Sequence, residues 1–223
     1  MREKIIAVIP AYNEEHTIGD VIRAVKKYVD EIIVTDDAST DKTGKIAAEL
    51  SATVVTHTTN LGYDKSLDDG FKEAAKQGAT ILFTFDADGQ HVAEDIPVLL
   101  APILSHTADV VVGVRPWRTR FAETAFAWYA KRKIGIHDPL CGMKAYTIQA
   151  YASVEYFDRL QSIGTELLFN CAKRRYRIVE TPIHLNKREG HPRFGSRIKG
   201  NWRIFIALIR ISRQFRTMKK YHG

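Results

Sequence analysis

Two aspartates one residue apart are the part of this sequence best suited to chemistry. Asp86 and Asp88 follow the apolar run 81–85, Ile-Leu-Phe-Thr-Phe. Two carboxylates at the end of a buried strand can share a divalent cation, because Mg²⁺ and Mn²⁺ prefer oxygen ligands and Mg²⁺ usually binds one or two carboxylates together with substrate phosphates. Such an ion would neutralise a diphosphate leaving group. Taken alone the pair is a common pattern, and a loop that merely begins with acids explains it at least as well.

Similar polar clusters follow other apolar runs in the first half of the chain. Residues 10–14 are Pro-Ala-Tyr-Asn-Glu, residues 36–41 are Asp-Asp-Ala-Ser-Thr-Asp, and residues 60–62 are Asn-Leu-Gly. With residues 86–91, Asp-Ala-Asp-Gly-Gln-His, they make four clusters, of which three contain acids. Clusters that recur after successive strands indicate one shared site.

The elements that must position these clusters are short apolar runs that alternate with helical patterns. We expect strands over residues 5–10, 31–35, 53–57, 80–85 and 109–114 and, less regularly, 143–146 and 177–185. We expect helices over residues 15–28, 41–50 (capped by Ser39 or Thr40), 64–77, 94–105 and 165–174 and, after a polar loop over 186–200, from about 201 to 217.

This alternation predicts an α/β fold with a mostly parallel central sheet covered by helices on both faces. Ligands of such sheets bind at the carboxyl ends of the strands, where all four clusters fall. We divide the chain into a catalytic domain, residues 1–200, and a basic amphipathic C-terminal helix, residues 201–223.

The clusters over residues 10–14, 36–41 and 86–91 together resemble those of family-2 glycosyltransferases, which have the GT-A fold. The resemblance is strong over about residues 4 to 115. It implies transfer of a sugar from a nucleotide-sugar donor with the help of Mg²⁺ or Mn²⁺.

Within that family the chain is most similar to the polyprenyl- and dolichyl-phosphate sugar transferases. Residues 137–145, His-Asp-Pro-Leu-Cys-Gly-Met-Lys-Ala, resemble their Asp-x-x-Ser/Cys-Gly-Phe-Arg/Lys segment, and residues 191–197 resemble their Arg-x-x-Gly-x-Ser-Lys loop. The loop departs from the pattern, because it lacks the residue usual between glycine and serine and has Arg197 in place of lysine.

Carried over residue by residue, the resemblance implies a role for each matching position. The nucleotide pocket would be lined by Pro10, Ala11, Tyr12 and Glu14. Asp37 would accept from the base, with Asp36 beside it. The metal and diphosphate would be held by Asp86, Asp88 and Gln90. Arg115 would lie near the transferring groups, and donor or acceptor phosphates would meet Arg193, Ser196 and Arg197.

The resemblance also implies a hexose transfer with inversion, by direct displacement, onto a polyprenyl or dolichyl phosphate. An acceptor phosphate is already anionic, so orientation and charge neutralisation would be sufficient without a strong base. If the acceptor is instead a hydroxyl of a glycan or glycolipid, a base is needed. Asp138 or Glu166 would then supply it, although a turn former at Asp138 and a first-turn helix acid at Glu166 explain these residues as well.

The C-terminal segment points to an anionic partner. Residues 187–223 carry a net charge of +10, whereas the whole chain carries +7. From Trp202 to Met218 the apolar residues Ile204, Phe205, Leu208, Ile211, Phe215 and Met218 recur mostly at spacings of three or four. A basic amphipathic helix of this kind suits an anionic membrane surface. The alternative is that the helix packs on its own domain or on a membrane-embedded partner subunit.

Two further features bear on where the protein acts. The sequence shows no signal peptide and no run of about 18 apolar residues, and its two cysteines read as reduced thiols. We therefore expect a cytoplasmic protein that is peripheral at the cytoplasmic face of a membrane. The aromatic residues Phe121, Phe126, Trp128 and Tyr129 could contact lipid at an acceptor surface or pack in the core.

Other classes fit less well. A nucleotidyltransferase or a dinucleotide-binding oxidoreductase needs a glycine-rich loop after the first strand, and residues 11–15 contain no glycine. The basic tail would permit a membrane- or nucleic-acid-binding module without catalytic activity. A mildly acidic body with carboxylates at strand ends does not suit nucleic acid, so we expect no such partner.

Overall fold

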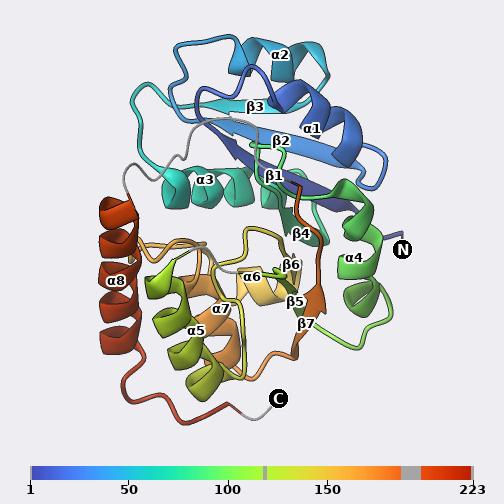
Figure 1. The fold of residues 1–223 in the computed structure, drawn as a ribbon. Coiled ribbons are helices and arrows are strands. Elements are labelled where there is room, and N and C mark those ends of the chain that lie inside the picture. Colours follow the sequence, from blue (N-terminus) through green and yellow to red (C-terminus); the bar gives the residue numbers. More distant parts are fainter. Residues whose placement is uncertain (1, 118–119, 187–196, 222–223) are drawn as a thin grey trace.

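The computed structural model describes residues 2–117, 120–186 and 197–221, and it shows a single seven-stranded sheet with helices on both faces (Figure 1). The strands are β1 (Ile5–Ala11), β2 (Glu31–Asp36), β3 (Thr53–Thr56), β4 (Ile81–Thr84), β5 (Val110–Val114), β6 (Lys144–Thr147) and β7 (Ile178–Pro182). Their order across the sheet is β3-β2-β1-β4-β6-β5-β7. Only β6 is antiparallel to its neighbours, so the predicted α/β fold with a mostly parallel sheet is confirmed.

Helices of the first half cover one face of the sheet. They are α1 (Ile18–Val25), α2 (Thr43–Glu49), the short 3₁₀ turn η1 (Ala93–Asp95) and α4 (Ile96–Leu104). Side chains alternate between the two faces of a strand, so Ala7 and Ile9 of β1 face these helices. The apolar stripe of α1, including Ile18 and Ile22, is buried in the same core as Ala7 and Ile9.

The other face is covered by α3 (Tyr63–Lys76), α5 (Phe121–Ile134), α6 (Ile148–Ala152), α7 (Glu166–Lys173) and α8 (Arg197–Gln214). Ile6 and Val8 of β1 point to this side. Gly70 of α3 lies directly over Val8, and a Cβ added to Gly70 would stand 2.3 Å from a Val8 methyl carbon. The missing side chain therefore lets α3 pack close to the middle of the sheet.

Several predicted boundaries were wrong at their ends. The first helix begins at Ile18 rather than residue 15, because the chain makes turns over residues 15–17. Neither Ser39 nor Thr40 caps α2, whose N-cap is Lys42. Residues 36–41 are used instead to join two loops: the Ser39 hydroxyl accepts from the backbone N–H of Asn13, and the Asn13 side chain accepts from Thr40 N.

The C-terminal helix differs most from expectation. It begins at Arg197, before the expected start near residue 201, and it packs against α5. Ile204, Ile211 and Phe215 of the predicted membrane-facing stripe are at most 4% exposed and belong to the same core as α5 and α7. Those three side chains are therefore not available to a membrane. Within the described ranges, no helix is long and apolar enough to cross a bilayer.

Candidate active site

The carboxyl ends of the strands open into a cavity of about 1470 Å³ that extends from β1 and β4 to α8. Eight of the residues assigned to the site from sequence line it: Pro10, Ala11, Tyr12, Asp37, Asp86, Asp88, Gln90 and Arg115. They come from loops up to about a hundred residues apart. The parallel strands bring them together because their carboxyl ends share one edge of the sheet.

Asp86 and Asp88 lie just after β4, and hydrogen bonds orient both carboxylates. Tyr63 donates its hydroxyl to Asp86 Oδ1 at 3.3 Å, and Gln90 donates its backbone N–H to Asp88 Oδ1 at 3.1 Å. Burial, together with the charge of Asp86, raises the pKa of Tyr63 well above its usual value. Tyr63 therefore stays a hydrogen-bond donor and holds the Asp86 carboxylate in one orientation.

The chain after residue 138 passes directly over this carboxylate. A Cβ added to Gly142 would stand 2.2 Å from Asp86 Oδ2 and 2.8 Å from His91 Cε1. Only glycine can approach so closely without a shift of the neighbours. Gly142 therefore fixes how deeply Asp86 is set below the segment that leads into β6.

The residues present fit a divalent cation that is completed by substrate. In the part of the chain that the structure describes, no three His, Cys, Asp or Glu side chains converge as a closed metal site. The donors at β4 are two carboxylates, which suits Mg²⁺ or Mn²⁺ bound together with phosphate oxygens. Beside them, the buried Nδ1 of His91 has no hydrogen-bond partner among the described residues and lies 3.7 Å from Asp86 Oδ2.

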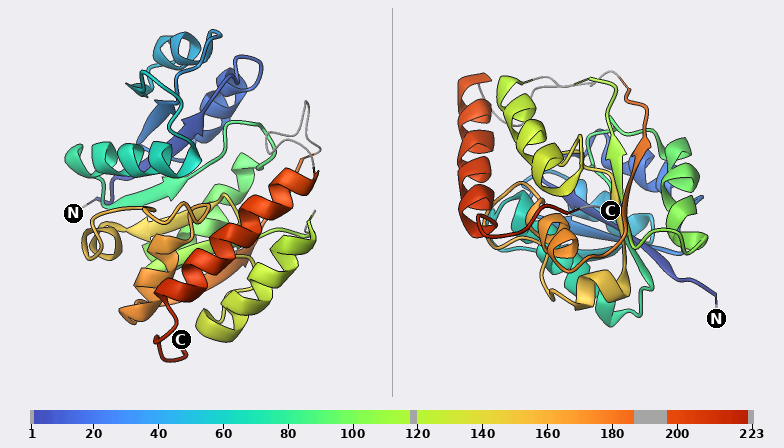
Figure 2. Two further views of the ribbon diagram at one scale, coloured as in Figure 1. Left: turned by 90° about the vertical axis from the view of Figure 1, so that its left-hand side faces the viewer. Right: turned by 90° about the horizontal axis from the view of Figure 1, so that it is seen from below.

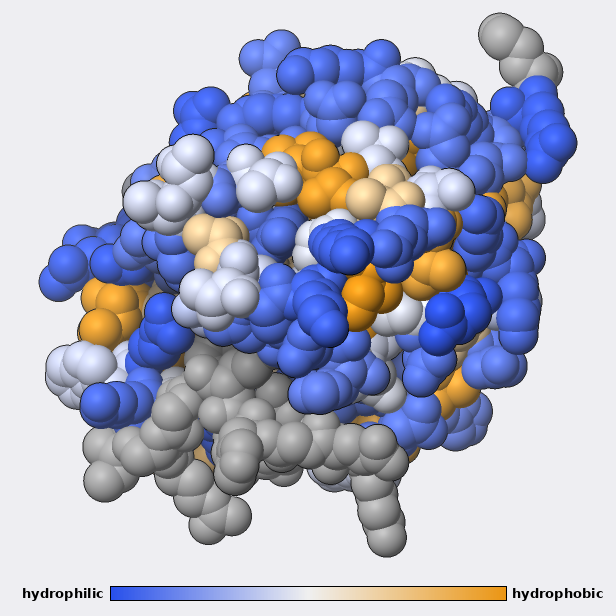
Figure 3. Space-filling model, turned by 90° about the horizontal axis from the view of Figure 1, so that it is seen from above, coloured by the Kyte–Doolittle hydropathy of each residue, from blue (hydrophilic) through white to orange (hydrophobic). Residues whose placement is uncertain are grey.

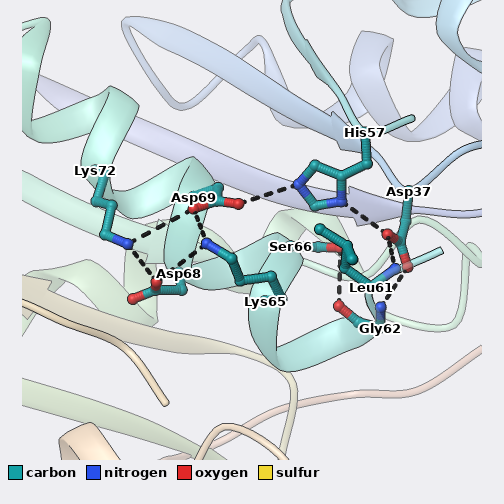
Figure 4. A network of polar contacts seen from close by, with 9 residues as sticks. All are labelled: Asp37, His57, Leu61, Gly62, Lys65, Ser66, Asp68, Asp69 and Lys72. Atoms are coloured by element: carbon teal, nitrogen blue, oxygen red, sulfur yellow. Dashed lines mark hydrogen bonds and ion pairs between the residues drawn. The ribbon is translucent and has the colours of Figure 1, made fainter. Parts of the chain in front are cut away.

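Asp37 is held by three donors rather than left open (Figure 4). Its carboxylate accepts the backbone N–H groups of Leu61 and Gly62 at 2.7 and 2.8 Å, and His57 Nδ1 lies 2.8 Å from Oδ1. The other ring nitrogen of His57 lies 3.2 Å from Asp69, which also pairs with Lys65. The cluster after β3 is therefore fastened to the cluster after β2 through Asp37.

Three predicted site residues do not line the cavity. Asp36 turns toward α2, where its carboxylate accepts Ser39 N and fills the space above Gly44. Glu14 accepts from the Thr17 hydroxyl at the start of α1. Asp138 is 2% exposed and lies behind Arg115.

Arg115 and Asp138 form a two-pronged ion pair. Nε and Nη2 of Arg115 each lie 2.8 Å from an oxygen of Asp138, and the Arg115 backbone N–H also donates to Oδ2 at 3.1 Å. Burial acts to lower the pKa of Arg115, but the hydrogen bonds and charge of Asp138 outweigh it and raise the pKa. Arg115 is therefore a permanent cation whose position is fixed by Asp138.

Glu166 is also occupied. It is 2% exposed, and its Oε2 accepts the backbone N–H groups of Arg159 and Leu160 at 2.6 and 2.9 Å. Burial raises the pKa of Glu166, and those two hydrogen bonds oppose the rise. The carboxylate orders the loop before α7, as a structural acid would.

A group of arginines in the cavity is not predicted by the sequence patterns. Besides Arg115, the lining contains Arg120, Arg159, Arg203 and Arg210. Arg203 and Arg210, on α8, had been read only as part of a basic helix. Their spacing of seven residues, two helical turns, placed them on one face, but nothing local in the sequence showed that this face borders the cavity.

Asp64 was missed as well. It lines the cavity and accepts the backbone N–H of Gly164 at 2.7 Å. Burial and then the charge of Asp158 raise the pKa of Asp64 to about 7. Asp158 comes from a segment 94 residues further along the chain, so no local pattern around Asp64 predicts this shift.

The remaining predicted phosphate contacts cannot be placed. Arg193 and Ser196 lie outside the described residues, and of Arg197 only the backbone, at the start of α8, is described.

Comparison with known proteins bears on what this cavity does. The family model described as glycosyl transferase family 2 matches residues 6–179. The chain is 28% identical to a UDP-N-acetylglucosamine–dolichyl-phosphate N-acetylglucosaminyltransferase of Methanococcus voltae, over 94% of this chain and 96% of that protein. It is 29% identical to the undecaprenyl-phosphate mannosyltransferase of Micrococcus luteus, over 83% of this chain and 85% of that protein.

A solved structure shares the fold. Glucosyl-3-phosphoglycerate synthase from Mycobacterium tuberculosis, in complex with Mn²⁺ and UDP-glucose, matches with a TM-score of 0.74 over 97% of this chain and 79% of that chain. The sequence identity is 21%, so this likeness concerns the fold alone.

Proposed function

This chain belongs to glycosyl transferase family 2, and on that premise we propose that it moves a hexose, with inversion, from a nucleoside-diphosphate sugar to a polyprenyl or dolichyl phosphate. The observation that carries the proposal is that one cavity holds two kinds of charge. Carboxylates at the strand ends line it, and so do five arginines between the end of β5 and α8, together with the acids Asp64, Asp68, Glu123 and Asp158.

The strand-end part suits the donor. Pro10, Ala11 and Tyr12 offer an apolar and aromatic wall at the end of β1, and Asp37 holds the adjoining Leu61-Gly62 backbone in place. The two relatives named above are a dolichyl-phosphate and an undecaprenyl-phosphate transferase, one of which is named for a UDP-sugar.

Asp86 and Asp88, with Gln90 beside them, would hold the divalent cation and the donor diphosphate. When bound, Mg²⁺ or Mn²⁺ supplies positive charge that stabilises the departing nucleoside diphosphate. Tyr63 and Gly142 fix the Asp86 carboxylate, so the protein meets the diphosphate with a preformed set of oxygens.

The arginine part suits an acceptor phosphate. Guanidinium groups bind phosphate through paired N–H donors, and they stay charged at any physiological pH. Arg115 is held rigid by Asp138, which lowers the cost of ordering it around substrate. In this arrangement Asp138 positions Arg115 and does not act as a base.

The absence of an available base at the two predicted positions favours a phosphate acceptor. Asp138 is paired with Arg115, and Glu166 is engaged by two backbone donors. A phosphate oxygen is already anionic and needs no proton removed, so orientation and charge neutralisation carry the reaction. The enzyme would then act as a peripheral protein at the cytoplasmic face of a membrane.

One observation supports a hydroxyl acceptor as the second candidate. Asp64 lines the cavity with its pKa raised to about 7, which is the range expected of a general base, although its two oxygens accept the backbone N–H groups of Ile163 and Gly164.

A turnover assay separates these candidates. Radiolabelled nucleotide sugars are offered with Mn²⁺ to a short polyprenyl phosphate and, as the matched control, to the polyprenol that lacks only the phosphate. Product from the phosphate alone is the expected result. Product from the polyprenol at a comparable rate would contradict the proposal and support the hydroxyl acceptor. If neither compound gives product with any sugar, the proposal is also contradicted.

A further inference from the structure

Exposed aromatic side chains gather on two neighbouring helices. Phe121 and Trp128 of α5 are 86% and 65% exposed, and Trp202 and Phe205 of α8 are 65% and 44% exposed. The two helices lie side by side and form one face of the molecule (Figure 2, left). Trp202 and Phe205 stack on each other with ring centroids 6.3 Å apart, so they form one apolar surface.

The exposed aromatics of α5 lie opposite its buried side. Phe121 and Trp128 are seven residues apart, hence on one face, while Phe126 and Ala130 are buried on the other. The aromatic cluster noted in the sequence is thus divided, because Phe126 packs in the core and Phe121 and Trp128 face solvent.

Helix α8 is apolar on both sides. Its inner stripe contains Ile204, Ala207, Ile211 and Phe215, all at most 4% exposed. Trp202, Phe205, Ile206 and Ile209 fall on the opposite side, and none of these four belongs to a buried core cluster. An exposed apolar surface bordered by polar residues marks an interaction site, so something outside the described chain is expected to cover this side of α8.

Basic residues border this apolar surface and exposed acids are missing from it. The C-terminal halves of the two helices and the segment after α8 carry Lys131, Arg132, Arg213, Arg216, Lys219 and Lys220, all exposed. The single acid in α5, Glu123, is 5% exposed, and the sequence of α8 contains no acid. Arg132 lies over the ring of Trp128, 5.7 Å from its centroid.

Two other faces lack this combination among the residues that the structure describes. The face above α1 and α2 is mostly hydrophilic, with scattered hydrophobic groups (Figure 3). On α4, Val98 and Leu104 are exposed apolar residues without an aromatic neighbour among the exposed ones. The combination of exposed aromatic side chains with bordering basic residues therefore distinguishes the α5 and α8 face from these two faces.

We propose that the outer face of α5 and α8, defined by Phe121, Trp128, Trp202, Phe205, Ile206 and Ile209, docks on an anionic lipid bilayer. Trp and Phe suit the headgroup boundary, and the bordering Lys and Arg side chains meet lipid phosphates. A second copy of the chain fits less well, because it would bring a surface of the same positive charge against this one.

The outer face adjoins the cavity. The flank of α8 that carries Arg203 and Arg210 lines it together with Ile206, and Trp117 lines it with its ring 53% exposed. A bilayer on the outer face would present a lipid phosphate at the arginine part of the cavity. This step rests on the proposed function, whereas docking itself does not require the protein to transfer a sugar.

Vesicle co-sedimentation tests the docking. The parent chain is mixed with vesicles of equal parts phosphatidylglycerol and phosphatidylcholine, and with pure phosphatidylcholine vesicles. Each basic residue near an anionic surface is expected to change the partition coefficient about fivefold. We expect Arg132→Gln/Arg213→Gln, and separately Trp128→Ala/Trp202→Ala/Phe205→Ala, to lower binding to anionic vesicles at least tenfold. The matched control, Val98→Ala/Leu104→Ala on α4, is expected to bind like the parent.

Three results would overturn the inference. They are a parent that does not bind anionic vesicles, an aromatic variant that binds as tightly as the parent, and a parent dimer in light scattering that the aromatic substitutions convert to monomer. Circular dichroism excludes unfolding, and Trp128→Phe/Trp202→Phe, which keeps the rings, is expected to retain most of the binding. Sugar transfer to a short water-soluble polyprenyl phosphate is measured in parallel. Its failure with vesicle binding intact contradicts the proposed function and leaves the docking face supported.

Discussion

Arg115 and Asp138, 23 residues apart in sequence, form a bidentate ion pair. Nε and Nη2 of Arg115 each lie 2.8 Å from a carboxylate oxygen of Asp138. The pair connects the end of β5 to the segment that passes over Asp86 on its way to β6. A carboxylate used in this way orients a cation and is not free to remove a proton. The relationship turns a candidate base into a positioning residue.

Asp138→Asn is therefore expected to act through Arg115. The substitution removes the negative charge and one acceptor oxygen from a buried ion pair. We therefore expect the free energy of unfolding to fall by about 3 kcal/mol and kcat/KM to fall by about 100-fold. The acidic limb of the pH–rate profile is expected to keep its midpoint. Loss of that limb in Asp138→Asn would identify Asp138 as a base and contradict this assignment.

Asp88→Asn is expected to abolish metal-dependent transfer and leave the fold intact. The substitution removes one of the two carboxylates at the end of β4, and a neutral amide is a much poorer ligand for Mg²⁺ or Mn²⁺. Turnover should fall at least about 100-fold, as it should for the parent protein in EDTA. Glu94→Gln, an exposed acid six residues away, serves as the control, and an Asp88→Asn enzyme with normal turnover would refute the metal assignment.

Gly142→Ala tests how closely the chain must approach Asp86. The new methyl would stand 2.2 Å from Asp86 Oδ2, so the carboxylate or the backbone has to move. We expect transfer to fall about 100-fold and stability to fall by about 1–3 kcal/mol. Gly19→Ala, whose Cβ would meet only side-chain atoms, the nearest a flexible Arg23 atom at 3.3 Å, should leave transfer unchanged and should not lower stability, because alanine favours the helix more than glycine does. Normal activity in Gly142→Ala would show that this approach is not needed.

Asp37→Asn is expected to weaken nucleotide binding and to lower the stability of the fold. An amide places a donor against one of the N–H groups of Leu61 and Gly62, which both point at this side chain. We expect nucleotide affinity, measured by calorimetry, to fall at least about tenfold and stability to fall by about 1–3 kcal/mol. Asp69→Asn, which touches His57 from the other side but not the Leu61-Gly62 backbone, should bind nucleotide within about threefold of the parent.

Asp64 gives a pH dependence of stability whose sign can be stated. Its pKa is about 7 in the folded protein against 3.8 ordinarily, so between about pH 4 and pH 7 the unfolded chain loses a proton that the folded chain keeps. The free energy of unfolding should therefore fall as the pH rises through this window. In urea titrations, Asp64→Asn should remove this slope and be about 1–3 kcal/mol more stable than the parent at pH 8. A parent whose stability rises over the same window would contradict the shift.

The same variant informs the choice of acceptor. If the acceptor is a phosphate, Asp64→Asn should keep most of its activity at pH 8. If the acceptor is a hydroxyl that Asp64 deprotonates, activity should fall by about 100-fold or more.

Local patterns predicted much of this protein correctly from sequence. The apolar runs before residues 10–14, 36–41 and 86–91 predicted strands, and the alternation with helices predicted a mostly parallel sheet. Because parallel strands end at one edge, the sequence also predicted that Pro10, Asp37, Asp86 and Asp88 would share a site, and they line one cavity. Their chemical roles stay predictions.

Only the tertiary structure decided which partner each side chain meets. The periodicity of α8 is the same whether its inner stripe meets a membrane or α5, and the structure places Ile204, Ile211 and Phe215 against the core and leaves Trp202 and Phe205 outside. Likewise, Asp138 taken from the sequence alone is explained equally by a base or by a turn former, and only the structure shows Arg115 beside it. Sequence periodicity reports the local repeat of a helix or strand, whereas burial and ion pairing depend on residues distant in the chain that only folding brings together.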